Sequence, residues 1–429
     1  MVLTGRAGLA ALVGILAVLA FRTVAAFAAV DGLILVAVVA DVALAGPVRS
    51  LRLSRAGDVK LLLNQTGTVR LTVYNSGSRT LRGIVRDAWR PSSGAAPARA
   101  QVSIPAGGQV TLTTTLTPQR RGDANPAEVT VRSVGPLGLA GRQGRHQVPW
   151  AVRVLPPFLS RKHLPQKLSV LRQLDGQNRA LHRGAGSEFD SLRQYVLGDD
   201  VRSIDWRSSA RRTEVVVRTW RPERDRRIVL VLDTGRTAAG RVGDIPRLDT
   251  AMDAALLLAA LAVRAGDRVD LLAVDRRVRA RVVGLSRAAV LPALTDAMAG
   301  LEAELIESDT GAIASAVLAT ARQRCLVVLL TDLNPSAVEQ GMTGLQLLAS
   351  RHQLLIAAVA DPRLAEMAAG RGDTRAIYAA AAAARAGAGR ARITALLRRH
   401  GVQVVDEPPD ALPAALADAY LSLKGQGRL

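Results

Sequence analysis

The 429-residue sequence has a single cysteine, few lysines and few aromatic residues. With only Cys325 present, an intrachain disulfide and a zinc site built from cysteines are both excluded. Aromatic residues make up 3% of the chain, too few for platforms on which nucleic-acid bases stack. Only four of the 57 basic residues are lysines, so arginine, spread through every region, carries the net charge of +21. This pattern predicts attraction to anionic lipid head groups rather than specific nucleic-acid binding.

The usual sequence signatures of catalysis are also missing. There is no phosphate-binding Gly-x-x-x-x-Gly-Lys loop, no His-Glu-x-x-His and no Gly-x-Ser-x-Gly. Cys325 opens an apolar segment, which favours buried packing over a role as a nucleophile. The five histidines show no ligand spacing: His146, His163, His182, His352 and His400. We therefore predict no catalytic residue and expect that the chain is not an enzyme.

The N-terminal 48 residues contain two apolar stretches, 7–21 and about 24–46. A membrane-spanning helix needs about 20 apolar residues, so the first stretch is short. A signal peptide is the alternative, but a second apolar run follows at once without a clear cleavage site. Residues 1–48 are therefore predicted to form a transmembrane helical hairpin. Asp41 is expected near the membrane interface or against the partner helix.

Basic residues flank this predicted hairpin on both sides. Arg6 precedes it, and Arg49, Arg52 and Arg55 follow it closely. The positive-inside rule then places both ends in the cytoplasm. The sequence thus predicts a multi-pass protein of the cell inner membrane whose soluble domains are cytoplasmic. The lipid bilayer is one of its predicted partners.

Two segments of different character follow the hairpin. Residues 49–155 contain Val- and Thr-rich runs separated by Gly, Pro, Asn and Ser, a pattern typical of a small antiparallel β-sandwich. Residues 156–226 are highly charged and are expected to form an irregular linker that carries a dense polar motif.

Residues 227–429 alternate short apolar runs with helical patterns. Examples are the runs 227–233, 268–275, 325–333 and 353–361. Such alternation predicts an α/β fold with a doubly wound, mostly parallel sheet covered on both faces. The Ala-rich stretch 376–391 is expected to be a helix with an end broken by glycine.

Two of these runs end in carboxylates, Asp233 and Asp332. Ligands of open parallel sheets bind beyond the carboxyl ends of the strands, so we expect the two side chains to meet. With the hydroxyl of Thr237 they would offer oxygen ligands suited to Mg²⁺.

The segment Asp233-Thr-Gly235-Arg-Thr237, with the later Thr331-Asp332, resembles the metal-ion-dependent adhesion site of von Willebrand factor type A domains. The resemblance implies that Asp233, Thr237 and Asp332 are metal ligands, with Thr310 as a further candidate. Gly235 stands where that family has its first serine, so one direct ligand is missing and a water would have to replace it.

The densest polar motif runs from Arg193 to Glu214. Gly-Asp-Asp at 198–200 is a turn signal, and carboxylates alternate with arginines around Trp206. The motif is interpreted either as an ion-pair network that clamps this segment onto the sheet or as a partner-docking surface, where Trp and Arg are favoured. The predicted interaction residues are Gly198, Asp199, Asp200, Asp205, Trp206 and Arg211.

This motif resembles the signature of the bacterial family called domain of unknown function fifty-eight. So do the stretch from Trp220 to Asp225 before the first apolar run, Leu330-Thr-Asp-Leu333, Arg351-His352, and Tyr420 to Gly427. The resemblance implies a membrane-tethered protein with a type A-like domain that works as an adaptor beside MoxR-type AAA+ ATPases, possible roles being protein-complex maturation or envelope assembly.

Two other functions stay open at the level of sequence. A metal-dependent hydrolase would use Asp233 and Asp332, with Asp199 and Asp200 nearby, because a bound divalent ion activates water. A surface binder of lipid or nucleic acid would act through the arginine excess.

Overall fold

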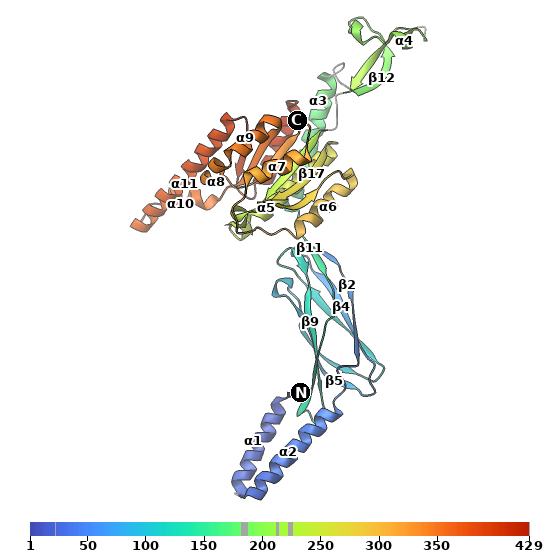
Figure 1. The fold of residues 1–429 in the computed structure, drawn as a ribbon, viewed down its shortest axis with the longest axis vertical. Coiled ribbons are helices and arrows are strands. Elements are labelled where there is room, and N and C mark those ends of the chain that lie inside the picture. Colours follow the sequence, from blue (N-terminus) through green and yellow to red (C-terminus); the bar gives the residue numbers. More distant parts are fainter. Residues whose placement is uncertain (22, 182–187, 212–213, 222–225, 429) are drawn as a thin grey trace. The chain divides into compact units, whose positions relative to one another are not determined.

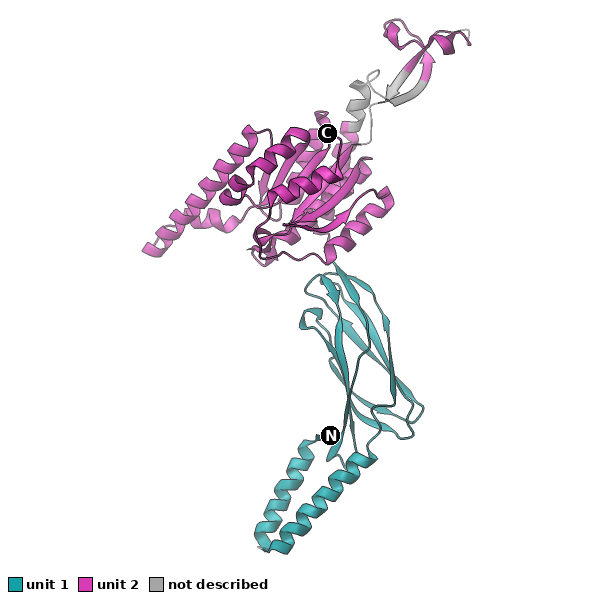
Figure 2. Cartoon of the chain, in the orientation of Figure 1, with its two compact units in different colours: residues 1–155 teal, residues 156–429 magenta. Residues whose placement is uncertain are grey.

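The protein is described by a computed structural model of residues 1–429, without residues 22, 182–187, 212–213, 222–225 and 429. The chain divides into two compact units, Met1–Leu155 and Pro156–Leu429 (Figures 1 and 2). Each unit is described separately below.

Unit 1 begins with two apolar helices that pack side by side, α1 (Gly5–Phe21) and α2 (Val24–Leu44) (Figure 1). Thr23 caps α2 by accepting a hydrogen bond from the Ala26 amide at 3.2 Å. At Gly14 the helices are so close that a Cβ would lie 2.9 Å from Val30. Among the described residues, α2 is the one helix long and apolar enough to cross a membrane, whereas α1 has 17 residues.

The rest of unit 1 is built from strands, mostly antiparallel. Its sheets have the orders β1-β10-β9-β5-β6, β2-β4-β7 and β3-β11-β8, and only β3 and β11 pair in parallel. Alternating Val and Leu side chains of the first two sheets share one buried core, as expected for a sandwich. The strands are β1 (Val2–Leu3), β2 (Leu51–Gly57), β3 (Lys60–Leu62), β4 (Gly67–Asn75), β5 (Leu81–Trp89), β6 (Arg99–Ile104), β7 (Gln109–Leu116), β8 (Gly122–Ala124), β9 (Pro126–Val134), β10 (Ala140–His146) and β11 (Val152–Leu155), with a 3₁₀ turn η1 (Pro91–Ser93).

Asp41 joins helix α2 to the β-sandwich. Its carboxylate is fully buried and accepts hydrogen bonds from the backbone amides of Leu137, Leu139 and Ala140 at 2.7–2.8 Å. Those residues form the turn between β9 and β10, and Gly135 beside it leaves no room for a Cβ, which would lie 2.2 Å from the Asp41 carboxylate. Asp41 is therefore a structural anchor, and the expectation that it packs against the partner helix is wrong.

Removing the Asp41 carboxylate should open this junction. We expect Asp41→Ala to leave three amides without an acceptor and to destabilise the turn by about 3 kcal/mol. Hydrogen exchange at residues 137–140 of the full chain in detergent micelles would measure the loss of protection. Asp31→Ala is the matched control, because Asp31 lies on the same helix and is exposed; equal protection in both variants would contradict the assignment.

Unit 2 starts with elements that the sequence pattern did not indicate. Residues 156–226, predicted to be an irregular linker, contain the 18-residue helix α3 (Leu164–Leu181) and a two-stranded hairpin of β12 (Glu188–Gln194) and β13 (Val216–Arg221). Apolar residues of α3, such as Leu171, join the main core of the unit. Because the segment as a whole is highly charged, this apolar side of the helix is not evident from its composition. The smaller elements here are η2 (Leu159–His163), η3 (Val201–Ser203) and α4 (Trp206–Ser209).

The body of unit 2 is a six-stranded sheet in the order β18-β17-β14-β19-β20-β21, which confirms a mixed α/β fold with parallel strands. Only the edge strand β18 pairs antiparallel. The four central strands are buried along nearly their whole length, as continuous apolar runs require when both faces are covered. The strands are β14 (Arg227–Asp233), β17 (Arg268–Val274), β18 (Val278–Val282), β19 (Leu326–Leu330), β20 (Gln353–Val359) and β21 (Gln403–Glu407), and β15 (Arg241–Val242) pairs with β16 (Ile245–Pro246) beside the sheet.

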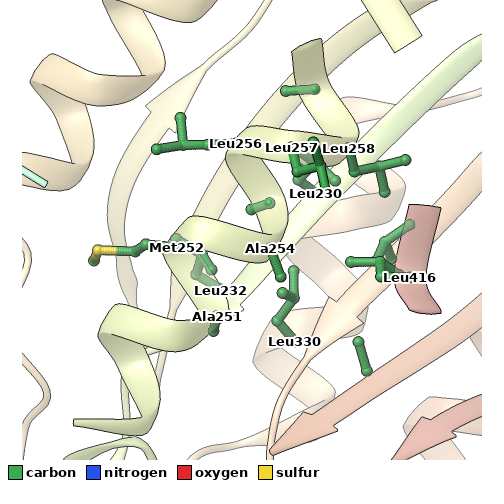
Figure 3. Close-up of a cluster of buried hydrophobic side chains, with 14 of the residues drawn as sticks. Leu230, Leu232, Ala251, Met252, Ala254, Leu256, Leu257, Leu258, Leu330 and Leu416 are labelled. Atoms are coloured by element: carbon green, nitrogen blue, oxygen red, sulfur yellow. The ribbon is translucent and has the colours of Figure 1, made fainter. Parts of the chain in front are cut away.

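Helices cover both faces of this sheet (Figure 1). One core joins the sheet to α5 (Arg247–Arg264), α6 (Arg287–Ala299) and α12 (Leu412–Gly425), and Figure 3 shows Leu230, Met252 and Leu416 within it. The opposite core contains α7 (Thr310–Thr320), α9 (Met342–Arg351) and α11 (Thr374–Arg399). The remaining elements are η4 (Arg236–Ala239), α8 (Pro335–Gln340) and α10 (Pro362–Ala369).

Helix α11 corrects the expectation of a glycine-broken end. It continues without interruption from Thr374 to Arg399, through Gly387 and Gly389. Asp373 caps its start, and the last turn packs Ile393 and Leu397 into the core. Packing of that end outweighs the modest cost of glycine in a helix interior.

Candidate functional site

Three carboxylates lie at the carboxyl ends of neighbouring strands, which we call the rim: Asp233 ends β14, Asp275 follows β17 and Asp332 follows β19. Strand β14 pairs with β17 on one side and β19 on the other, so Asp233 occupies the point where the sheet reverses its winding. This is the place where open α/β sheets bind ligands.

Asp233 is almost completely buried and is held by neutral donors. Its Oδ1 accepts hydrogen bonds from the Gly235 amide at 2.9 Å and from the Ser308 hydroxyl, and its Oδ2 accepts one from the Thr331 hydroxyl at 2.5 Å. Both carboxylate oxygens are thus occupied by protein groups.

Asp332 is held differently, by two arginines. Its Oδ2 lies 2.7 Å from Nη1 of Arg247 at the start of α5, and its Oδ1 lies 2.7 Å from Nη1 of Arg390 on α11. Arg390 also contacts Asp406 on β21 at 2.6 Å. Burial disfavours the charged guanidinium, but the contacts with Asp406 and Asp332 outweigh it and raise the pKa of Arg390. We call Arg247, Asp332, Arg390 and Asp406 the arginine bridge.

Asp275 shapes the neighbouring loop. It accepts hydrogen bonds from the amides of Arg276 and Arg277 and lies 2.5 Å from Nε of Arg279. Burial acts to raise the pKa of Asp275, but these hydrogen bonds outweigh it and the pKa is lowered. The side chain also accepts the hydroxyl of Thr234 at 3.2 Å, which ties the ends of β14 and β17 together.

The residues of the rim do not fit a divalent ion. A Cβ on Gly235 would lie 2.0 Å from the Ser308 hydroxyl, so the place of the missing serine ligand is filled by another side chain. The two guanidinium groups on Asp332 already supply positive charge where a metal would. Within the described residues, no group of three or more His, Cys, Asp or Glu is placed to hold a metal ion.

Two further predicted ligands lie elsewhere. Thr237 sits half-buried in η4 and is not among the hydrogen-bond partners of Asp233 in the described part of the chain. Thr310 is the first residue of α7, and its hydroxyl lies 2.0 Å from where a Cβ on Gly341 would stand. Thr310 therefore packs against the junction of α8 and α9. Ser308 on Asp233 and both arginines on Asp332 were not predicted as parts of the site, because no local pattern marks them.

Space at Gly235 can be tested directly. Gly235→Ala should destabilise unit 2 by about 1–3 kcal/mol, because its Cβ meets the Ser308 hydroxyl. Adding Ser308→Ala should recover part of that loss, since it removes the oxygen in conflict. Urea unfolding of the single and double variants forms the cycle; strictly additive losses would contradict the geometry.

The motif between Arg193 and Glu214 forms the loop of the β12–β13 hairpin, and its carboxylates fold that loop. Asp199 pairs with Arg193 at 2.5 Å and accepts the Val196 amide, while Asp200 caps η3. Asp205 caps α4 and lies 2.8 Å from Nε of Arg218. Gly198 has φ +109°, a conformation that favours glycine.

These contacts leave an apolar tip in solvent, made of Val196, Leu197, Val201 and Trp206. Leu197 is 96% exposed and Trp206 is 66% exposed. Of the six predicted interaction residues, Trp206 belongs to this tip, Arg211 is exposed, and the other four shape the loop. The other residues of the tip, Val196, Leu197 and Val201, were not predicted. Their signal in the sequence is that apolar residues lie on either side of Gly-Asp-Asp. The family-like residues Pro222 to Asp225 lie outside the described residues.

Cys325 and His352 form a buried pair at the amino ends of the neighbouring parallel strands β19 and β20, away from the rim. Cys325 Sγ lies 3.4 Å from His352 Nδ1. Burial raises the pKa of the Cys325 thiol to about 11 and lowers the pKa of His352. A protonated thiol in the core is a poor nucleophile.

The lowered pKa of His352 makes unit 2 sensitive to acid. The folded protein protonates His352 less readily than the unfolded chain, whose imidazole takes up a proton below about pH 6.5. Stability should therefore fall as the pH drops below that value. We expect His352→Gln to flatten this part of the stability–pH curve in urea unfolding, and exposed His400→Gln to leave it unchanged. Parallel curves for all three proteins would contradict the assignment.

Fold and rim together define a mixed α/β protein with a parallel sheet whose strand ends carry a fixed set of buried charges. Within this class, residues 191–377 match the model of the family described as "Protein of unknown function DUF58". The matched segment is less than half of the chain, and over it the resemblance predicted from the sequence is confirmed.

The curated relatives of this chain are mycobacterial proteins. Uncharacterized proteins of Mycobacterium tuberculosis and Mycobacterium bovis are 30% identical over 216 residues. The alignment covers 47% of this chain and 65% of each relative, which is less than two thirds of their length.

Similarity to solved structures is weak. The CARDB domain of the PF1109 protein from Pyrococcus furiosus, solved with di-metal ions, covers 24% of this chain and 91% of its own, with 18% identity and a TM-score of 0.19. Proximal thread matrix protein 1 of the mussel byssus, solved with a zinc-occupied MIDAS motif, covers 47% of this chain and 46% of its own, with 13% identity and a TM-score of 0.25. At these scores neither structure identifies a ligand for this chain.

Proposed function

We propose that the chain is a membrane-anchored adaptor that works with a MoxR-type AAA+ ATPase and acts by binding, without catalysis of its own. The apolar tip of the β12–β13 hairpin carries this proposal. Four exposed apolar side chains on one loop cost free energy in water, and exposed apolar patches mark protein or membrane contacts. The loop beneath them is held by Asp199 and Asp205, so the tip is preorganised to bind.

The membrane anchor in this proposal is the pair α1 and α2, with the rest of the chain in the cytoplasm. Arg6, Arg49 and Arg52 are exposed near the hairpin ends, in keeping with the positive-inside rule. Arg55 gives no support to this orientation, because it is buried against Asp87 at 2.6 Å. Both ends of the hairpin join the sandwich, through β1 pairing with β10 and through Asp41. A spanning hairpin would therefore keep both ends on the side of the sandwich.

The sheet is proposed to be a von Willebrand factor type A-like domain that has lost its metal. The winding of the sheet and the position of Asp233 and Asp332 support the likeness. The arginine bridge and the closed space at Gly235 argue against metal binding, and with it against a hydrolase that uses Asp233 and Asp332 to activate water.

The tip can be tested through recovery of the ATPase. The full chain, purified in mild detergent from its native membranes, should bring down a MoxR-type AAA+ ATPase identified by mass spectrometry. Trp206→Ala and Leu197→Ser should each reduce recovery of the ATPase, because both side chains become buried in the proposed complex. Truncating an aromatic anchor at an interface costs about 2 kcal/mol or more, roughly thirty-fold in affinity.

Leu305→Ser is the matched control, since Leu305 is 78% exposed and lies far from the hairpin in sequence. It should leave recovery unchanged. Absence of any such ATPase, or equal recovery with all variants, would overturn the proposal. Loss of binding to anionic vesicles in the tip variants, with ATPase recovery intact, would assign the tip to the membrane instead.

A further inference from the structure

A groove of about 780 Å³ lies beside Asp332 on the rim. It is bounded by the loop after β19, the side of α10 and a long stretch of α11. Its charged lining consists of one carboxylate, Asp332, and four arginines: Arg247, Arg385, Arg390 and Arg392. Neither the apolar tip nor the membrane anchor uses this surface.

The floor of the groove is apolar because α11 carries small residues there. Ala382, Ala386 and Gly389 line it, and Leu364 and Pro335 form its apolar sides. At 1.5 Å per residue, the stretch from Ala382 to Arg392 is about 15 Å long. A second cavity of about 920 Å³ continues along α10 and α11 and shares Leu364, Ala388 and Arg390 with the first. Together they offer an elongated track with an apolar floor.

The arginines of the groove are not equally occupied. Arg247 and Arg390 belong to the arginine bridge, and Arg392 is 2.9 Å from the exposed Glu339. Arg385 is exposed and has no ion-pair partner among the described residues. Positive charge thus exceeds negative charge, and guanidinium groups bind carboxylates through paired hydrogen bonds.

We propose that this groove binds an acidic segment of a protein partner, with arginine in the role that a divalent ion would have at a metal-containing rim. The proposal rests on the proposed function, because it treats the rim as a surface for protein partners. The bridge fixes Arg247 and Arg390 without any added cation, so binding is independent of metal. Carboxylates of the partner meet Arg385 and Arg392, and its methylene and backbone groups cover the alanine floor.

A peptide suits this groove better than a nucleic acid does. No aromatic side chain lines either cavity, so bases would have nothing to stack on. A phosphodiester backbone would leave the apolar floor in contact with water, whereas an extended or helical peptide would cover it.

The test uses the full chain in phosphatidylcholine nanodiscs, which add no net lipid charge. The probe is a fluorescein-labelled peptide of eight glutamates, followed by fluorescence anisotropy, with a peptide of eight glutamines as the neutral counterpart. We expect binding of the acidic peptide only, weakening as salt rises. Arg385→Ala combined with Arg392→Ala should weaken it about five- to tenfold, because each exposed pair contributes up to about fivefold.

Arg375→Ala is the matched control, since Arg375 is exposed on the same helix but lines neither cavity. It should leave the affinity unchanged, as should EDTA or added Mg²⁺. Arg385 and Arg392 are both exposed, so the double variant should fold. Charge reversal, with Arg385→Glu and Arg392→Glu, should shift preference from the glutamate peptide to a peptide of eight lysines.

Several results would overturn the inference. These are equal binding of the glutamine peptide, no effect of the double variant, loss of binding in EDTA, or tighter binding of a single-stranded oligonucleotide that the same variants abolish. Leu197→Ser and Trp206→Ala should not alter peptide binding. A failed peptide experiment with intact ATPase recovery would thus remove the groove proposal alone, and a failed recovery with intact peptide binding would remove the tip.

Discussion

The arginine bridge is the interaction on which the rim depends. It joins the start of α5, the end of β19, helix α11 and strand β21 through one carboxylate and one guanidinium that each have two partners. Arg390 and Asp332 are mostly buried, and removing either one leaves another member of the bridge without its ion-pair partner, at a cost of up to about 3–5 kcal/mol. Helix α11, which lines the groove, is thereby fixed to the strand ends.

The aspartates Asp233 and Asp332, at the ends of neighbouring strands, have different surroundings. Asp233 is surrounded by an amide and two hydroxyls, whereas Asp332 lies between two cations. The first arrangement satisfies a buried carboxylate without neutralising it, and the second neutralises it completely. A pair of strand-end aspartates therefore does not define a metal site by spacing alone. The partners that arrive from distant parts of the chain decide its chemistry.

Local patterns in the sequence predicted the sheet but not the ion pairs around its strand ends. Runs such as 227–233 are short and apolar, and their alternation with helical patterns indicates central parallel strands. Arg247 and Arg390 lie 85 and 58 residues from Asp332, so their pairing depends on helix placement that no local pattern contains. Helix α3 was not predicted for a related reason, because only its tertiary contacts distinguish it from a charged linker.

The apolar tip and the arginine groove suit different parts of a binding event. Charged residues around a groove accelerate encounter with an oppositely charged partner, and salt weakens that effect. Buried aromatic and aliphatic contacts instead slow dissociation, because they must be rehydrated when the complex separates. A chain that bears Trp206 and Leu197 on one loop and Arg385 and Arg392 along one helix separates these two tasks. In the proposed complex, the salt dependence of association would come from the groove and the lifetime of the complex from the tip.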